Sequence, residues 1–291
     1  MNWPKSCAIK VNYPLREQTT FRIGGKARFF CEPRGEAELA SLMRSAGKNR
    51  LPVFVMGAGS NLLVSDKGVK GLVIRLRSPH FKKIALERGC IRAGSGALLA
   101  QLIKFSIDRS LGGLEFLVGI PGTLGGALAM NAGCWESSIG ELVKEVRVMD
   151  RSGKIRLISA REIGFAYRSS GLEKYIILGA LLKAQKGRRQ QAESKAAAYL
   201  GFRLKNQDLT RPNAGCIFRN PPQRYAGKMI DSCGLKGRRI GGAFISERHA
   251  NFIMNSGKAR SQDVLDLMRL MQNKVRKNFR VTLQPEIKIW E

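Results

Sequence analysis

The chain has 291 residues, of which 51 are Lys or Arg and 22 are Asp or Glu, so its formal net charge is +29. This length allows two or three compact units, and an apolar content of 44% is ordinary for a globular protein. No uninterrupted apolar run reaches the ~18 residues that a membrane helix needs. The first residues, Met1 to Cys7, lack the apolar core of a signal peptide. We therefore expect a cytoplasmic protein without membrane insertion.

The positive charge permits a nucleic-acid partner or a polyanionic small molecule. The basic residues are dispersed, and the densest run, at 183–189, is typical of a solvated linker rather than of a groove-reading helix. A basic nucleic-acid-binding protein is therefore the less favoured alternative. The six cysteines are scattered without a CxxC pair, and the chain has two histidines, so we expect reduced thiols and no metal site.

The first part of the chain predicts a β-α-β beginning. A turn and a strand are expected over 19–30, after an opening segment at 11–15. Apolar residues at helical spacing predict a helix, and short apolar runs predict strands before and after a glycine-rich turn. These elements are the helix at 36–47 and the strands at 52–56 and 72–76.

The rest of the chain continues with both kinds of element. Residues 81–93 alternate around a turn at Arg88-Gly89, and further strands are expected at 142–149, 155–159, 175–182 and 252–255. Helices are expected at 97–109, 186–205, 226–233 and 261–279. The polar helix at 186–205 is expected to join two domains. Ser261 is the expected N-cap of the last helix.

A glycine-rich turn, Gly57-Ala58-Gly59-Ser60-Asn61, directly follows the strand at 52–56. Such a turn can hold a pyrophosphate. It is not a dinucleotide fingerprint, because Leu62 stands where the third glycine belongs and no clear helix follows. A hairpin turn explains the pattern equally well.

The segment 114–133 is apolar enough to be buried, yet five of its residues are glycine. Each glycine costs roughly 0.5–1 kcal/mol of backbone order, and the usual gain is close approach to a ligand. Pro121 sets φ in the turn, Thr123 adds a hydroxyl, and 124–130 reads as a short helix whose free N–H groups favour a phosphate. A tightly packed buried turn is the open alternative.

The order Gly-Ile-Pro-Gly-Thr-x-Gly-Gly-Ala-x-x-x-Asn-Ala-Gly over 119–133 resembles the flavin-contacting segment of the UDP-N-acetylenolpyruvoylglucosamine reductases, the MurB family. Further segments that resemble family motifs follow the same order along nearly the whole chain: 19–25, 57–61, 167–168, 214–221, 249–253 and 285–286. Any one of these segments alone is weak evidence for the family, but the whole series in this order is specific to it. The short spacing between Arg168 and Cys216 leaves little room for the extra substrate-covering loop of one branch of the family. In this respect the chain resembles the shorter, type II branch.

The resemblance implies an α+β flavoenzyme of three domains. A two-part, PCMH-type FAD-binding region comprises 1–75, to which the tail 284–291 returns, and 76–200, and an α+β substrate-binding domain comprises 201–283. The protein is expected to be a monomer with non-covalent FAD. The residues implied to contact the cofactor are Gly57, Ala58, Gly59, Ser60, Asn61, Gly119, Ile120, Pro121, Gly122, Thr123, Gly125, Gly126, Ala127, Asn131, Ala132 and Gly133.

The implied reaction is the NADPH-dependent, FAD-mediated reduction of an enolpyruvyl ether of UDP-N-acetylglucosamine to UDP-N-acetylmuramate, a peptidoglycan precursor. A hydride from the flavin reaches C3, and a proton reaches C2. Negative charge then develops on the substrate carboxylate, and cations or hydrogen-bond donors placed there stabilise the transition state. The expected partners are therefore the UDP-sugar substrate and NADPH, without nucleic acid.

The family's catalytic positions are matched by Arg168, Glu286 and Cys216. Arg168 would bind the substrate carboxylate with its planar fork, and Glu286 would act near the same carboxylate in its protonated form. Cys216 stands where the family usually has serine as the proton donor to C2. A thiol, with an ordinary pKa of ~8.5, is a better acid than a hydroxyl, so it is a plausible replacement.

Contacts to the UDP-sugar substrate are implied for Tyr167, Arg168, Asn220, Arg224 and Lys228, with Lys228 as a phosphate-binding cation. Phe244 departs from the family, because a polar residue is expected there. His249 is expected to pack and form hydrogen bonds rather than to catalyse. The nearest alternative is another FAD-dependent oxidoreductase on the same flavin domain, and the set Arg168, Cys216 and Glu286 argues against it.

Overall fold

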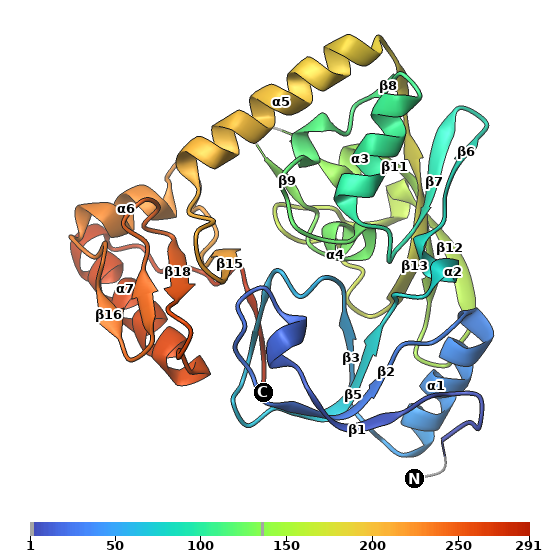
Figure 1. The fold of residues 1–291 in the computed structure, drawn as a ribbon, viewed down its shortest axis with the longest axis horizontal. Coiled ribbons are helices and arrows are strands. Elements are labelled where there is room, and N and C mark those ends of the chain that lie inside the picture. Colours follow the sequence, from blue (N-terminus) through green and yellow to red (C-terminus); the bar gives the residue numbers. More distant parts are fainter. Residues whose placement is uncertain (1–2, 135–136) are drawn as a thin grey trace. The chain divides into compact units, whose positions relative to one another are not determined.

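The structure is a computed structural model that describes residues 3–134 and 137–291 (Figure 1). Met1 and Asn2, the start of the N-terminal stretch discussed above, lie outside these residues. Helices and mostly antiparallel sheets make up an α+β architecture. The chain divides into two compact units, each described by itself: residues up to 11, 29–58 and 71–202 form the first, and 12–28, 59–70 and 203–291 the second. The expected three-domain division stays a prediction.

One sheet has the order β1-β2-β5-β3 and consists of β1 (Lys10–Pro14), β2 (Lys26–Cys31), β5 (Val69–Arg75) and β3 (Val53–Met56). Strands β3 and β5 pair in parallel. Helix α1 (Glu36–Lys48) lies between β2 and β3 in the sequence and buries Leu39, Leu42 and Met43 in one core with Phe81. The helical spacing of apolar residues therefore predicted this helix correctly, because those residues share one face.

The larger sheet of the first unit is antiparallel and has the order β12-β11-β13-β7-β6. Its strands are β6 (Ile84–Glu87), β7 (Cys90–Gly94), β11 (Val143–Met149), β12 (Ile155–Ser159) and β13 (Ile176–Lys183). The predicted turn between β6 and β7 is confirmed, since Arg88 and Gly89 have φ of 48° and 74°. Helices α3 (Leu99–Asp108) and α4 (Leu124–Ala129) contribute Leu102 and Leu128 to the core of this sheet.

Short elements complete the first unit: α2 (Pro79–Lys82), β8 (Leu111–Gly112), β9 (Gly133–Cys134), β10 (Ser137–Ser138) and β14 (Gln185–Lys186), with 3₁₀ turns at Glu115–Leu117, Ile139–Leu142 and Ala160–Glu162. Strand β14 pairs with β8, and β10 pairs with β9. The second pairing closes the glycine-rich segment onto the residues that follow it.

The expected polar helix is α5 (Arg189–Asn206), and the boundary between the two units falls inside it, after residue 202. Within the second unit, Arg248 donates hydrogen bonds to the carbonyl oxygens of Leu204 and Lys205. These bonds satisfy carbonyls that the last turn of a helix leaves without partners. None of the helices in the described ranges is long and apolar enough to cross a membrane.

The second unit contains an antiparallel sheet in the order β15-β18-β17-β16, with helices α6 (Ala226–Ser232) and α7 (Ser261–Phe279). The strands are β15 (Asn213–Cys216), β16 (Arg239–Ile240), β17 (Ala243–Ile245) and β18 (Phe252–Asn255), and a 3₁₀ turn lies at Arg16–Gln18. Strand β19 (Lys288–Trp290) runs parallel to β4 (Leu62–Val64). Phe21, Leu63 and Ile287 are buried in the same core as α6 and α7.

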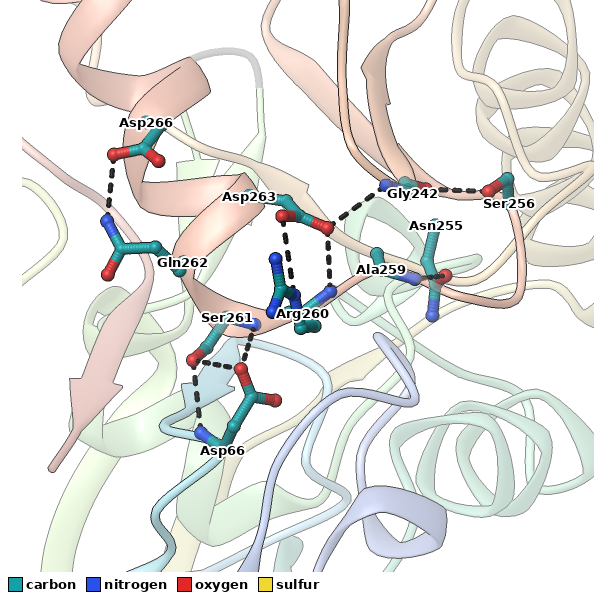
Figure 2. A network of polar contacts seen from close by, with 10 residues as sticks. All are labelled: Asp66, Gly242, Asn255, Ser256, Ala259, Arg260, Ser261, Gln262, Asp263 and Asp266. Atoms are coloured by element: carbon teal, nitrogen blue, oxygen red, sulfur yellow. Dashed lines mark hydrogen bonds and ion pairs between the residues drawn. The ribbon is translucent and has the colours of Figure 1, made fainter.

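The start of α7 differs from the expectation, as Figure 2 shows. Arg260 is the N-cap residue, and Ser261 is the first residue of the helix. The backbone N and Oγ of Ser261 both donate to Asp66 Oδ2 at 2.8 Å, and Asp263 accepts from the backbone N of Arg260 and Gly242 at 3.0 Å. The N-cap prediction was wrong because the Ser261 hydroxyl bonds to Asp66, 195 residues away: it accepts from Asp66 N at 3.0 Å and donates to the Asp66 carboxylate instead of capping its own helix.

Candidate active site

The two glycine-rich segments meet in the first unit. A Cβ added to Gly57, directly after β3, would lie 2.7 Å from Thr123 Oγ1 and 3.9 Å from Gly126 Cα. Thr123 is the N-cap of α4, and its hydroxyl oxygen accepts a hydrogen bond from Gly126 N at 3.3 Å. Glycine at 57 therefore allows the end of β3 to approach the first turn of α4.

The first N–H groups of α4 are bonded within the unit. Leu124 N donates to Ala97 O at 2.9 Å, and Gly125 N donates to Ser95 O at 2.8 Å. Gly126 N is bonded to the Thr123 hydroxyl. The prediction that free N–H groups at this helix start favour an anion is thus wrong, because the cap and the segment after β7 already accept from them.

Several glycines of this segment are required by the protein's own packing. A Cβ at Gly125 would lie 2.9 Å from Ser95 Cβ, and one at Gly133 would lie 2.1 Å from Ser137 O. Gly119 has a φ of 75°, a conformation that L side chains rarely adopt. The packed-turn alternative therefore accounts for part of the motif.

Gly126 is different from these glycines. It is exposed, and outside its own helix a Cβ there would meet only Thr123 Oγ1, at 3.6 Å. The protein itself has room for a side chain at this position. A glycine that packing does not demand leaves backbone surface open to a ligand, beside Gly57 and Thr123.

The turn at 57–61 continues into the second unit, where Gly59 and Asn61 contact their own neighbours. A Cβ at Gly59 would lie 2.3 Å from Gln18 O, and Gly59 has a φ of 71°. Asn61 Nδ2 donates to Glu286 O at 3.1 Å, and Lys288 N donates to Asn61 O at 2.9 Å. Asn61, expected as a cofactor contact, thus holds the backbone of a predicted catalytic residue.

Arg168 lies at a tight turn of the first unit. Ala166 and Ser169 exchange backbone hydrogen bonds of 2.9 and 3.1 Å, and Arg168 between them has a φ of 56°. A non-glycine residue in this left-handed region costs of order 1–3 kcal/mol, so the surrounding bonds must hold it. The guanidinium carbon lies 5.0 Å from the ring centroid of Tyr167, whose side chain is half exposed.

Cys216 and Glu286 lie on adjacent backbone segments of the second unit. Glu286 N donates to Ile217 O at 2.8 Å, and Phe218 and Pro285 form an antiparallel bridge. Cys216 ends β15 after a register irregularity, at which Gly215 has a φ of 75°. Such bulges re-aim side chains beside functional sites. The fold therefore brings together two predicted catalytic residues that are far apart in the sequence.

Asn251 was missed by the sequence analysis as an individual residue. It is 2% exposed, and its side chain accepts from Phe218 N at 3.0 Å and donates to Phe218 O at 2.8 Å. Its backbone O accepts from Ile217 N at 2.9 Å. Asn251 thus holds the segment that follows Cys216. The signal was a polar residue directly before the apolar strand β18, where a buried polar side chain is tolerated only if its hydrogen bonds are made.

His249 packs and forms hydrogen bonds, as predicted. Its Nδ1 accepts from Asn251 N at 3.3 Å, and its ring centroid lies 4.7 Å from that of Phe252. Burial lowers the pKa of His249, so the ring stays neutral near pH 7. A Cβ at Gly227 would lie 3.4 Å from His249 Cε1, so His249 also supports the first turn of α6.

Three of the predicted substrate residues, Asn220, Arg224 and Lys228, lie around the start of α6. Asn220 Oδ1 accepts from Ala226 N at 3.0 Å, so Asn220 orders the beginning of this helix. Arg224 and Lys228 are exposed, and Lys228 Nζ lies 5.1 Å from the ring centroid of Tyr225. Phe244 instead contacts Arg239, whose Cζ lies 4.3 Å from its ring centroid.

Comparisons with known protein families find a match for an N-terminal segment and another for a C-terminal segment of the chain. Residues 27–159 match the FAD binding domain family, and residues 207–290 match the family described as UDP-N-acetylenolpyruvoylglucosamine reductase, C-terminal domain. A cholesterol oxidase from Brevibacterium sterolicum is 17% identical with a TM-score of 0.50, covering 64% of this chain and 39% of its own. That similarity concerns the fold alone.

Relatives that match nearly the whole length of this chain are named as the same reductase. UDP-N-acetylenolpyruvoylglucosamine reductase 2 of Symbiobacterium thermophilum is 43% identical, over 97% of this chain and 92% of the relative. The reductase of Caldanaerobacter subterraneus subsp. tengcongensis is 39% identical, over 98% and 94%. The MurB crystal structure from Thermus caldophilus superposes with a TM-score of 0.83 at 34% identity, over 98% of this chain and 99% of that one. This chain therefore belongs to the UDP-N-acetylenolpyruvoylglucosamine reductase family.

Proposed function

We propose that Cys216, Glu286 and Arg168 are the residues with which this member of the family reduces the enolpyruvyl ether of UDP-N-acetylglucosamine to UDP-N-acetylmuramate. The observation that carries this assignment is the pairing of the Cys216 and Glu286 segments through Glu286 N and Ile217 O, 2.8 Å apart. A proton donor, Cys216, and a hydrogen-bond donor, Glu286, then stand on neighbouring backbone segments, which suits a reaction that adds one proton and develops negative charge on a carboxylate.

The first unit fits a flavin. Gly126 leaves open backbone beside Gly57 and Thr123, which is the kind of surface that a tightly bound planar cofactor and its phosphates need. FAD, which the family uses with NADPH, supplies the hydride that reaches C3 of the substrate. We assign the segments 57–61 and 119–133 to holding it, with Asn61 contributing through the backbone it orders.

The chain's own residues supply the rest of the chemistry. Arg168 binds the substrate carboxylate and stabilises the negative charge that grows there when C3 gains a hydride. Glu286, protonated, donates a hydrogen bond to the same developing charge. Cys216 Sγ gives its proton to C2, and water later reprotonates the thiolate. The sum is one hydride and one proton added across the C2–C3 double bond.

Substrate binding outside the reacting group is assigned to the start of α6. Exposed Lys228 binds a phosphate of the UDP group, and Arg224 adds positive charge nearby. Asn220 and Tyr167 contact the sugar or the enolpyruvyl side. The type II branch, the three-domain division and the monomeric state stay predictions, and light scattering on the purified protein tests the last of them.

A cytoplasmic site of action is also proposed. Its support is that none of the six cysteines, all of which lie in the described ranges, is joined in a disulfide: Cys7, Cys31, Cys90, Cys134, Cys216 and Cys233. Free thiols are the rule in reducing compartments and the exception in oxidising ones.

The purified protein tests the function directly. We expect flavin absorption near ~450 nm, bleaching by NADPH without oxygen, and recovery of colour on addition of the enolpyruvyl substrate, with a product two hydrogens heavier by mass spectrometry. A different oxidoreductase on this fold would bleach with another substrate and would not recover colour with this one. A nucleic-acid-binding protein would be colourless and would bind DNA in a strongly salt-dependent way.

Gly126 offers a test of the flavin site that spares the fold. Gly126→Val should fold, because its Cβ meets only Thr123 Oγ1 at 3.6 Å, yet it should lose most of its flavin to the added side chain. The measurement is the ratio of flavin to protein absorbance together with a thermal melt. Gly125→Val is the contrasting variant, since a Cβ there lies 2.9 Å from Ser95 Cβ and the fold itself should suffer. A folded Gly126→Val protein with a full complement of flavin would contradict the assignment.

A further inference from the structure

We propose that Asn131 is a positioning residue for Arg168: its side chain fixes the turn that places the guanidinium on the substrate carboxylate. This inference rests on the proposed function of Arg168. It changes the part played by Asn131, which resemblance alone assigns to the cofactor.

Both ends of the Asn131 side-chain amide form hydrogen bonds. Nδ2 donates to Ala166 O at 3.0 Å, and Oδ1 accepts from Gly140 N at 2.9 Å. Asn131 is 6% exposed and has a φ of 43°, a conformation that asparagine tolerates better than most residues. A buried amide with both ends bonded is rigid, because losing either bond leaves a desolvated polar atom.

Ala166 is the residue that closes the turn around Arg168. Its carbonyl oxygen accepts from Ser169 N at 3.1 Å inside the turn and from Asn131 Nδ2 outside it. The left-handed φ of 56° at Arg168 persists only if such bonds outweigh its conformational cost. The hydrogen bond from Asn131 therefore holds the carbonyl group of Ala166, which closes the turn. In this way it helps to fix the backbone of Arg168, from which the side chain extends.

A second bond ties the same two segments. Ser170, which is fully buried, donates from Oγ to Ala129 O at 3.0 Å. A Cβ at Gly140 would lie 2.7 Å from the ring of Phe165 and 2.8 Å from Asn131 Oδ1, so the residue before the turn is also packed against the partner of Asn131. These contacts connect the segment at the end of α4 to the Arg168 turn within the first unit.

A double-mutant cycle tests the inference. Asn131→Ala should slow reoxidation of the reduced enzyme by the enolpyruvyl substrate about 10-fold and weaken binding of UDP-N-acetylmuramate to the oxidised enzyme to a similar degree, with little change in reduction by NADPH. Combined with Arg168→Ala, it should add little to either defect, because it acts through Arg168. Calorimetric titration of the product provides a readout that does not depend on turnover.

Two further variants separate positioning from loss of structure. Asn131→Asp keeps the acceptor for Gly140 N but puts an oxygen against Ala166 O, so it should show the defect at least as strongly as Asn131→Ala. Asn255→Ala is the matched control: this buried asparagine also makes bonds at both ends, to Phe21 O at 2.9 Å and from Gly257 N at 2.7 Å, in the second unit. Because Asn255 does not act through Arg168, the fold-changes caused by Asn255→Ala and Arg168→Ala should multiply in the double variant.

The outcomes are distinct. If Arg168→Ala itself leaves reoxidation and product binding unchanged, the proposed function of Arg168 fails. If Arg168→Ala is defective but Asn131→Ala is normal in both measurements, or multiplies with Arg168→Ala as the control does, the positioning role fails while the function of Arg168 stands. A loss of flavin in a folded Asn131→Ala protein would return Asn131 to a cofactor role and overturn the inference.

Discussion

Cys216→Ala should retain its flavin and its reduction by NADPH, but its reoxidation by the enolpyruvyl substrate should be slower by about 10²-fold or more, the usual contribution of a general acid. The variant removes the proton that C2 receives and leaves the site of hydride addition untouched. Cys216 is half-buried at the end of β15, so the smaller side chain should cost little stability. Stopped-flow absorbance of the flavin band separates the two half-reactions.

Cys216→Ser is the informative comparison. The family resemblance implies a serine at this position, and its hydroxyl can donate a proton from nearly the same place, so Cys216→Ser should recover much of the rate. Matching melting temperatures for the two variants would exclude a difference in folding. If Cys216→Ala is reoxidised as fast as the unaltered protein, Cys216 only packs beside Ile217 and the proton has another source.

Arg168→Ala should slow the same half-reaction by about 10²–10³-fold, which corresponds to the ~3–4 kcal/mol that one donor to a developing oxyanion contributes. The charge that Arg168 stabilises appears only when the substrate accepts a hydride, so reduction by NADPH should be nearly normal. Arg168→Lys should restore part of the rate, because an ammonium keeps the charge but lacks the two parallel donors of the guanidinium.

Glu286→Gln provides a second probe of that charge. An amide can still donate a hydrogen bond, so its defect should be smaller than that of Arg168→Ala and confined to the same half-reaction. An equal loss in both half-reactions, for either variant, would instead place the residue in flavin binding or in folding. Flavin content and melting temperature, measured on each purified variant, decide between those two.

The regular elements were predictable because their signals are local. The apolar spacing of Leu39, Met43 and Ala46 predicted α1, and the pair Arg88-Gly89 predicted the turn between β6 and β7. Both depend on residues within a few positions of one another, whose periodicity or backbone preference is a property of the chain itself. The N-cap of α7 failed for the complementary reason, since Ser261 is bonded to Asp66, in a different part of the chain.

The site was predictable as a set of segments but not as a set of contacts. Family motifs singled out 57–61, 119–133, Cys216 and Glu286, yet they did not distinguish a glycine kept for packing from one kept for a ligand. Gly125 and Gly126 are adjacent in sequence, and only their neighbours in space separate them: Ser95 lies against the first, and the second is exposed. Close approach of this kind is decided by atoms from other segments.

The sequence by itself determined the family, the fold class, the longer helices and strands, and the residue types available for catalysis. The tertiary structure alone decided which of these residues act together. Asn61 bonds to Glu286 across 225 positions, and Asn131 bonds to Ala166 across 35, so that two asparagines of the proposed flavin motifs hold the segments of two proposed catalytic residues, Glu286 and Arg168. An amide's partner is whichever buried donor or acceptor the fold brings within about 3 Å, and a linear pattern carries no record of that distance.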